Sequence, residues 1–169
     1  MKTADLTRIA LMAAFISICS LVVIPGLVPF TLQTFAVFFT FGVLNSKQST
    51  YAIGLYLLLG LVGLPVFSGF TSGIGQLLGP TGGYLWGFLA AAYALHWLKK
   101  SKALAGLNKR VLPYLALAIC YALGSSWFYL QQGGKFGFGK VIMLTILPFI
   151  IPDLIKIELA LNLSKRVKV

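Results

Sequence analysis

Apolar residues form six long segments along the chain, separated by shorter stretches that are richer in glycine, proline or charge. A helix needs roughly 20 mostly apolar residues to cross a membrane, and several of these segments approach that length. Helices are the expected form, because an open sheet in lipid would leave backbone groups unpaired. The predicted spans are residues 8–25, 30–45, 50–67, 80–98, 111–131 and 141–164.

The composition places this pattern in a membrane rather than in water. Of the 169 residues, 59% are hydrophobic and only 10% are charged, whereas soluble domains carry about 25% charged residues. The first apolar segment ends without a small-residue cleavage site, so we expect it to be a helix and not a signal peptide. The sequence therefore predicts an all-α polytopic membrane protein with one transmembrane domain, residues 1–169, folded as a six-helix bundle.

Basic residues are distributed unevenly between the two sides of the predicted bundle. With the N-terminus inside, 11 of the 14 basic residues fall on the cytoplasmic side: Lys2, Arg8, Lys47, Lys99, Lys100, Lys102, Lys109, Arg110, Lys165, Arg166 and Lys168. This bias satisfies the positive-inside rule and predicts that both termini are cytoplasmic, in a plasma membrane. Topology and anionic lipid then account for the net charge of +11, and we expect no nucleic-acid partner.

The last predicted span contains charges, which are costly inside a bilayer. Asp153 and Lys156 lie three residues apart in IIPDLIKIELALNL, so both project from one face of a helix. Pro152 favours a helix start, with Asp153 in the first turn, although Pro148 and Pro152 could instead kink one long helix. Intramembrane charges usually pair, face the interior and bind a ligand or ion. A purely structural ion pair is the alternative, and Glu158, on another face, has no assigned role.

Residues from other segments complete a candidate ligand site. Gln33 supplies both a donor and an acceptor, which complement the acceptors of Asp153 and the donors of Lys156. Four aromatic residues are candidates for the apolar walls: Phe67, Tyr84, Trp86 and Trp127. A few polar anchors in an apolar aromatic cavity suit a small amphiphilic molecule.

The glycine-rich connection and the small residues of the first segment can each be interpreted in two ways. The connection 63–88 is rich in glycine and uncharged, as a lid over a site requires, but a loose loop would have the same composition. In the first segment, Ala10 and Ala14 lie four residues apart and form a small-residue face that lets another helix approach closely. Ordinary packing within the bundle explains the same spacing.

Nothing in the sequence indicates an enzyme or a resident cofactor. His96 is the only histidine, so a histidine-based metal site is excluded, and Cys19 and Cys120 lie in apolar segments as small hydrophobic residues. Ser125 and Ser126 have no base nearby and are interpreted as helix-packing hydroxyls. Residues 134–141, GKFGFGKV, imitate a phosphate-binding loop but have valine where the magnesium ligand belongs.

Four segments resemble, in order, the BioY family: VPFTLQTFAV, LYLLLGLVGLPVFSGF, LLGPTGGYLWGF and IPDLIKIELA. These proteins are the biotin-binding S components of energy-coupling factor (ECF) transporters. The resemblance implies a six-helix bundle that captures biotin near the outer face and delivers it with a transmembrane coupling subunit and two cytoplasmic ATPases. Asp153 and Lys156 match the family's biotin-anchoring pair, and Ala10 and Ala14 match its docking motif.

The chain departs from the family pattern in the glycine-rich loop, where some relatives have an asparagine that contacts the ligand. Thr71, Ser72 and Gln76 are the candidate replacements, and we take Ser72, Tyr84 and Gln33 as ligand-binding residues beside the charged pair. The alternatives are a solitary biotin facilitator, an S component for another small vitamin, a scaffold that transports nothing, and an intramembrane enzyme.

Overall fold

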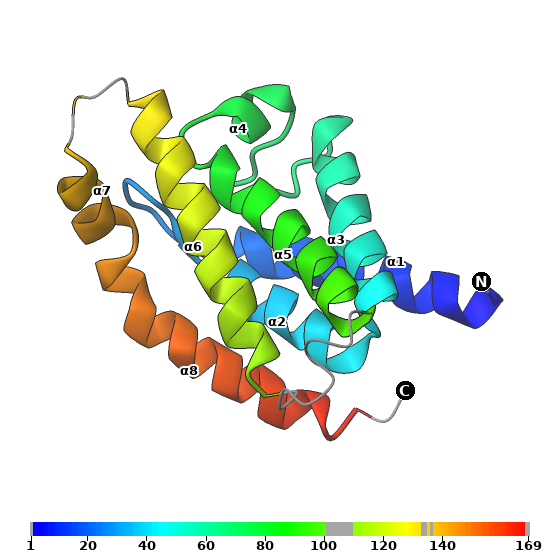
Figure 1. Cartoon of the computed structure of the whole chain (residues 1–169). Coiled ribbons are helices and arrows are strands. Elements are labelled where there is room, and N and C mark those ends of the chain that lie inside the picture. The colour runs from blue at the N-terminus through cyan, green and yellow to red at the C-terminus, as the bar shows by residue number, and fades with distance from the viewer. Residues whose placement is uncertain (1, 101–109, 133–134, 136, 168–169) are drawn as a thin grey trace.

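The computed structural model describes residues 2–100, 110–132, 135 and 137–167, and most of them are helical. The helices are α1 (Thr3–Leu21), α2 (Gln33–Val43), α3 (Ser46–Leu61), α4 (Ile74–Leu78), α5 (Gly82–Lys100), α6 (Leu112–Gln131), α7 (Phe138–Thr145) and α8 (Leu147–Ser164). They gather into one bundle, in which α5 packs on α3 and α6 while α2 packs on α8 (Figure 1). A mainly helical fold is thus confirmed.

Length and composition alone support only some of the six predicted spans. Among the described residues, α1 and α6 are each long and apolar enough to cross a membrane. The helices α7 and α8 would make a third span, bent by 41°. The second predicted span is shorter than expected, because α2 has 11 residues. Six membrane-crossing helices therefore remain a prediction.

Local sequence explains where several helices begin. Asn45 caps α3: its side chain accepts a hydrogen bond from the backbone N–H of Gln48, and the Gln48 side chain returns to the Asn45 backbone. Pro113 and Pro148 occupy the first turns of α6 and α8, where a residue without an N–H is tolerated. The last predicted segment consists of two helices: α7 ends at Thr145 and α8 begins at Leu147. Pro152 therefore lies inside α8 and does not start it.

The two strands and the short helix α4 (Ile74–Leu78) were not predicted. The strands β1 (Val23–Ile24) and β2 (Phe30–Thr31) pair as a small antiparallel hairpin between α1 and α2. The glycine-rich connection contains α4 and has positive φ at Gly63, Gly69, Phe70 and Gly73. Three of these four residues are glycines, which adopt that conformation without strain.

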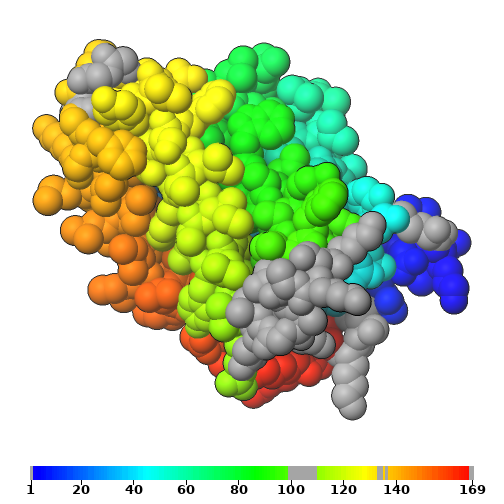
Figure 2. Space-filling model, viewed as in Figure 1, coloured from blue at the N-terminus to red at the C-terminus, as the bar shows by residue number. Residues whose placement is uncertain are grey.

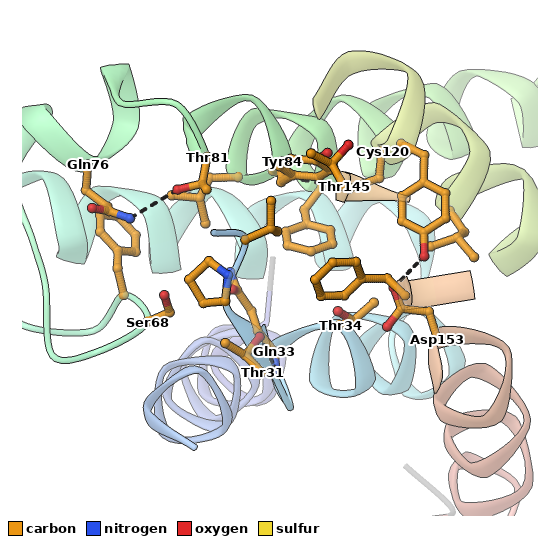
Figure 3. A pocket seen from close by; sticks show the side chains of 18 residues that line it. Thr31, Gln33, Thr34, Ser68, Gln76, Thr81, Tyr84, Cys120, Thr145 and Asp153 are labelled. Atoms are coloured by element: carbon orange, nitrogen blue, oxygen red, sulfur yellow. Dashed lines mark hydrogen bonds between the residues drawn. The ribbon is translucent and has the colours of Figure 1, made fainter. Parts of the chain in front are cut away.

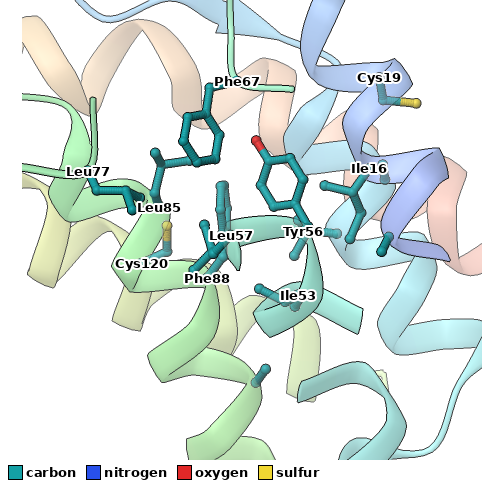
Figure 4. Packing of buried hydrophobic residues seen from close by; sticks show 14 residues of the cluster. Ile16, Cys19, Ile53, Tyr56, Leu57, Phe67, Leu77, Leu85, Phe88 and Cys120 are labelled. Carbon is teal, nitrogen blue, oxygen red and sulfur yellow. The ribbon is translucent and has the colours of Figure 1, made fainter. Parts of the chain in front are cut away.

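Buried aromatic residues and glycines fix how closely the helices pack. Tyr56 and Phe67 are both fully buried and meet edge to face, 5.5 Å between ring centroids, in the middle of the main core cluster (Figure 4). Between α5 and α6, a Cβ at Gly83 would overlap Trp127, and one at Gly124 would overlap Tyr84. The two glycines therefore allow the close approach that brings Tyr84 of α5 to the site.

Candidate functional site

A cavity of about 80 Å³ lies between the hairpin, the glycine-rich connection and helices α2, α5, α6, α7 and α8 (Figure 3). Its polar lining residues come from both sides, with Asp153, Thr31, Gln33 and Thr34 opposite Tyr84, Thr81 and Thr145 (Figure 3). Its apolar lining residues are Val28, Pro29, Phe67, Leu85, Phe88, Leu117 and Phe149. This combination of apolar walls and a few polar groups is typical of small-molecule sites.

The predicted pair of charges is present and buried. Lys156 Nζ lies 3.0 Å from Asp153 Oδ1, and the two residues are 6% and 4% exposed. Both side chains face the bundle interior, as their spacing predicts. The prediction that Asp153 lies in a first helical turn is wrong, because α8 begins at Leu147 and its first turn has no acidic residue. Pairing and hydrogen bonds, not the helix dipole, therefore accommodate the buried carboxylate.

A network that sequence reasoning missed holds this pair in place. The Tyr121 hydroxyl of α6 donates to Asp153 Oδ2 at 2.7 Å, and Lys156 Nζ donates to the Thr31 carbonyl of β2 at 2.8 Å. Lys156 Nζ also lies 4.0 Å from the ring centroid of Phe30, a cation–π contact. The partners are 32 and 125 residues away in sequence, so no local pattern could have identified them.

Lys156 differs from Asp153 in its position relative to the cavity. Asp153 lines the cavity, whereas Lys156 is absent from the lining and uses its N–H groups on Asp153 and Thr31. The amine therefore fixes the carboxylate and the hairpin to one another. Asp153 is left as the charged side chain that faces the cavity.

Gln33 and Tyr84 both reach the cavity, as the sequence predicts. Gln33 Nε2 donates to the Tyr56 hydroxyl at 3.0 Å, which fixes the amide. The Tyr84 hydroxyl is buried and has no hydrogen-bond partner among the described residues. A buried hydroxyl without a partner is costly and marks a position where a ligand could supply one.

The glycine-rich connection contributes only one of its three predicted polar residues to the cavity, together with Ser68, which was not predicted. Ser72 does not line the cavity, whereas Ser68 and Gln76 do, and Gln76 Nε2 donates to Thr81 Oγ1 at 3.4 Å. The positive φ angles at Gly69, Phe70 and Gly73 change the chain direction between these positions, so sequence neighbours do not share a face. Gln76 is thus the one of the three candidate replacements that reaches the cavity.

Two of the four predicted aromatic walls lie elsewhere. Phe67 and Tyr84 line the cavity, but Trp86 and Trp127 line a separate groove on the side of α5 and α6. Helices in a membrane are apolar on more than one face, so composition alone does not show which aromatic residues point inward.

The small residues of α1 divide between two faces. Ala10 and Ala14 are exposed, while Ala13 is fully buried in the main core cluster. The exposed face also carries Leu6, Leu11 and Ile18. Ala10 and Ala14 therefore do not serve packing within this bundle, and their face is open to another helix.

Other chemically notable residues lie outside the cavity or are inert in this arrangement. Cys19 and Cys120 are free thiols, and among the described residues no cluster of three or more His, Cys, Asp or Glu side chains could hold a metal ion. Glu158 is exposed on α8 and accepts a hydrogen bond from the Tyr114 hydroxyl of α6.

Comparisons with known proteins identify the family of the chain. The model of the BioY family matches residues 1–169. The chain is 39% identical to the biotin transporter BioY of Thermotoga maritima, covering 97% of this chain and 95% of that one. It is 35% identical to a probable biotin transporter BioY of Pyrococcus horikoshii, covering 99% and 98%.

A solved structure extends the likeness to three dimensions. It is the 2.1 Å crystal structure of an S-component for biotin from an ECF-type ABC transporter, with a TM-score of 0.83 and 30% sequence identity. The likeness covers 98% of this chain and 93% of that one. With the family match over the whole sequence, these findings establish that the chain belongs to the BioY family.

Proposed function

We propose that this protein binds biotin and is the substrate-specific membrane subunit of an ECF-type transporter. The observation that carries the proposal is Asp153, a buried carboxylate held by Lys156 and Tyr121 on the wall of an apolar cavity, in a chain of the BioY family. Binding and transport require no covalent chemistry, so the proposal assigns no catalytic residue.

The chemistry of biotin fits the two ends of the cavity. Its fused rings carry two N–H donors and one carbonyl, its thioether is apolar, and its tail ends in a carboxylate. Asp153 would accept from the ring N–H groups, because its oxygens accept hydrogen bonds and the ion pair keeps them oriented. Tyr84, whose hydroxyl has no partner among the described residues, would donate to the ligand.

The tail would lie toward the glycine-rich connection. Ser68, Gln76 and Thr81 supply hydroxyl and amide donors there, at the end of the cavity away from Asp153 (Figure 3). Uncharged donors suit a carboxylate, and an acidic group at this end would repel it. The apolar walls between the two ends would bury the rings.

The glycine-rich connection would act as a lid. The cavity of about 80 Å³ is smaller than the roughly 300–1,000 Å³ of typical ligand sites. Biotin therefore requires the walls to move apart. The connection supplies Phe67, Ser68 and Gln76 to the cavity and contains glycines with positive φ, which can absorb backbone rotation.

Energy would come from partners that dock on α1. The exposed Ala10–Ala14 face allows close approach of a helix from a transmembrane coupling subunit, which two cytoplasmic ATPases would drive. The proposal includes six membrane-crossing helices, with α7 and α8 as one bent span, in the plasma membrane. Both termini would be cytoplasmic, as the positions of the basic residues favour.

The test is binding of biotin and of lipoate by the purified protein in lipid nanodiscs, measured by calorimetry. Lipoate has the same pentanoate tail and an apolar sulfur-containing ring but lacks the two ring N–H donors. We expect biotin to bind at least 100-fold more tightly. Equal affinities would contradict the role of Asp153, and absence of biotin binding would overturn the function.

Uptake of labelled biotin distinguishes a subunit of an ECF transporter from a solitary facilitator. In cells with the coupling subunit and ATPases we expect accumulation, and in cells without them only a small fraction of it. Equal uptake in both would identify a solitary facilitator. Substituting Ala10 and Ala14 with leucine should lower uptake and leave biotin binding unchanged, because both side chains are exposed on α1, away from the cavity.

A further inference from the structure

A second hollow lies on the outside of the bundle, over α3, α5 and α6, the face that Figure 2 presents. This lateral groove has a volume of about 560 Å³ and is lined by Thr50, Gly83, Trp86, Leu89, Ala90, Tyr93, Leu123 and Trp127. It shares no lining residue with the cavity that holds Asp153. None of its lining residues is charged, so its occupant is apolar along most of its length.

The walls of the lateral groove are fixed without an occupant. Trp86 Nε1 donates to the Leu77 carbonyl at 3.1 Å, and Trp127 Nε1 donates to the Gly79 carbonyl at 3.0 Å. Both indoles are thereby tied to the end of α4. A groove whose large side chains are already held loses little side-chain freedom on binding, which favours a bound molecule over transient contact.

Aromatic residues and a cation lie near the end of the groove that is away from Trp86 and Trp127. Tyr93 of α5 lies there, and its hydroxyl accepts from Trp97 Nε1 at 3.0 Å. On α3, the lining residue Thr50 lies one turn after Lys47, whose Nζ is 5.9 Å from the ring centroid of Tyr51. Exposed aromatic rings beside a lysine are typical of the membrane–water interface.

No acidic residue lines the groove, and the Asp5 carboxylate of α1 lies near this end, where it accepts a hydrogen bond from Gln48 Nε2 of α3 at 2.9 Å. The chain has only three acidic residues, Asp5, Asp153 and Glu158, and these lie on α1 and α8. Lys47 is exposed at the start of α3, one turn before the lining residue Thr50. A molecule with a long apolar part and an anionic head matches this distribution, because the groove takes the chain and Lys47 takes the head.

We infer that the lateral groove binds an anionic glycerophospholipid, with an acyl chain along Ala90, Leu123 and the two tryptophans and its phosphate toward Lys47. The held indoles of the groove and the lysine near its end predict one defined lipid site. The inference does not depend on biotin binding, since no residue of the biotin site takes part.

Native mass spectrometry of the full chain tests this inference without biotin. The protein is reconstituted in equal amounts of phosphatidylglycerol and phosphatidylcholine and released into mild detergent. We expect one retained phospholipid per chain, with phosphatidylglycerol favoured at least fivefold. Lys47→Gln should remove the preference, and Ala90→Phe, which fills the groove, should remove the retained lipid.

Matched controls distinguish the site from general effects. Lys165→Gln removes an exposed charge at the end of α8, and Leu159→Phe enlarges an exposed apolar side chain of α8, so neither should change lipid retention. Retained lipid in the bulk ratio, or equal losses in the controls, would overturn the inference. It would also be overturned if Ala90→Phe left lipid retention intact but prevented assembly with the coupling subunit, because the occupant would then be a protein helix.

Discussion

Two tyrosine–carboxylate pairs connect α6 to α8, and they differ in surroundings rather than in kind. Tyr121 donates to Asp153 at 2.7 Å. Tyr114, near the start of α6, donates to Glu158. Asp153 is 4% exposed and lines the cavity, whereas Glu158 is exposed and lines none of the hollows described above. Each acid would look equally functional from its presence in an apolar segment.

The difference shows what turns a membrane-embedded acid into a ligand site. A buried carboxylate is tolerated only where other groups stabilise its charge, and at Asp153 these are Lys156 and Tyr121. The same groups orient its oxygens toward the cavity. Glu158 is exposed and faces no cavity, so its pair with Tyr114 fastens two helices.

The largest effect is expected on removing the cation. Lys156→Met leaves Asp153 as a buried charge without its ion-pair partner, which should cost roughly 3–5 kcal/mol of unfolding free energy. Denaturant titration in mixed micelles measures this loss. Lys165→Met, which removes an exposed lysine at the end of α8, is the matched control and should change little.

A second variant shows whether the loss comes from the orphaned charge. In Asp153→Asn/Lys156→Met both partners are neutral, so the double variant should be more stable than Lys156→Met alone. If the two variants were equally stable, the lysine would act mainly through Thr31 and Phe30 of the hairpin and not through Asp153.

Asp153→Asn is expected to have the largest effect on ligand binding. It removes the charge that strengthens the hydrogen bonds and turns one acceptor into a donor facing the ring N–H groups of biotin. We expect the dissociation constant to rise about 100-fold, roughly 3 kcal/mol. Calorimetry in nanodiscs measures it, with Glu158→Gln as the control, and a change below fivefold would place the ligand elsewhere.

The general position of this site could be read from the sequence because its key pair is local. Asp153 and Lys156 are three residues apart, and helix geometry alone puts them on one face. The apolar segments likewise located the main helices, since each predicted span overlaps one of them, although the ends of α1, α3 and α5 lie outside the predicted bounds. The start of the last helix could not be predicted, because Pro148 and Pro152 both satisfy the local rule for a first-turn proline. In the structure Pro148 lies in the first turn of α8 and Pro152 inside the helix.

The rest of the site depends on contacts between distant parts of the chain. The hairpin strands have two residues each, too few for an alternating pattern to appear. Thr31 reaches Lys156 through a backbone carbonyl, which every residue has, so no side-chain signal existed. Ser68 rather than Ser72 lines the cavity because the loop between them bends at residues with positive φ.

Tyr121→Phe should have an intermediate effect. It removes one hydrogen bond to a charged acceptor, worth about 1.5–3 kcal/mol, but the freed oxygen of Asp153 remains available to the ligand. We therefore expect biotin affinity to fall only about 5- to 20-fold, because a less firmly oriented carboxylate binds less well. Unchanged affinity together with lower stability would show that Tyr121 only packs the helices.

The smallest effect is expected at the exposed pair. Tyr114→Phe removes the hydrogen bond to Glu158 without disturbing the cavity, so biotin affinity measured by calorimetry should stay within twofold of the original. Any loss of stability should be small, because water or lipid headgroups can replace the bond at an exposed position. If Tyr114→Phe instead weakened biotin binding as much as Tyr121→Phe does, the two pairs would be coupled through α8. Burial would then not be what separates a ligand site from a helix fastener in this protein.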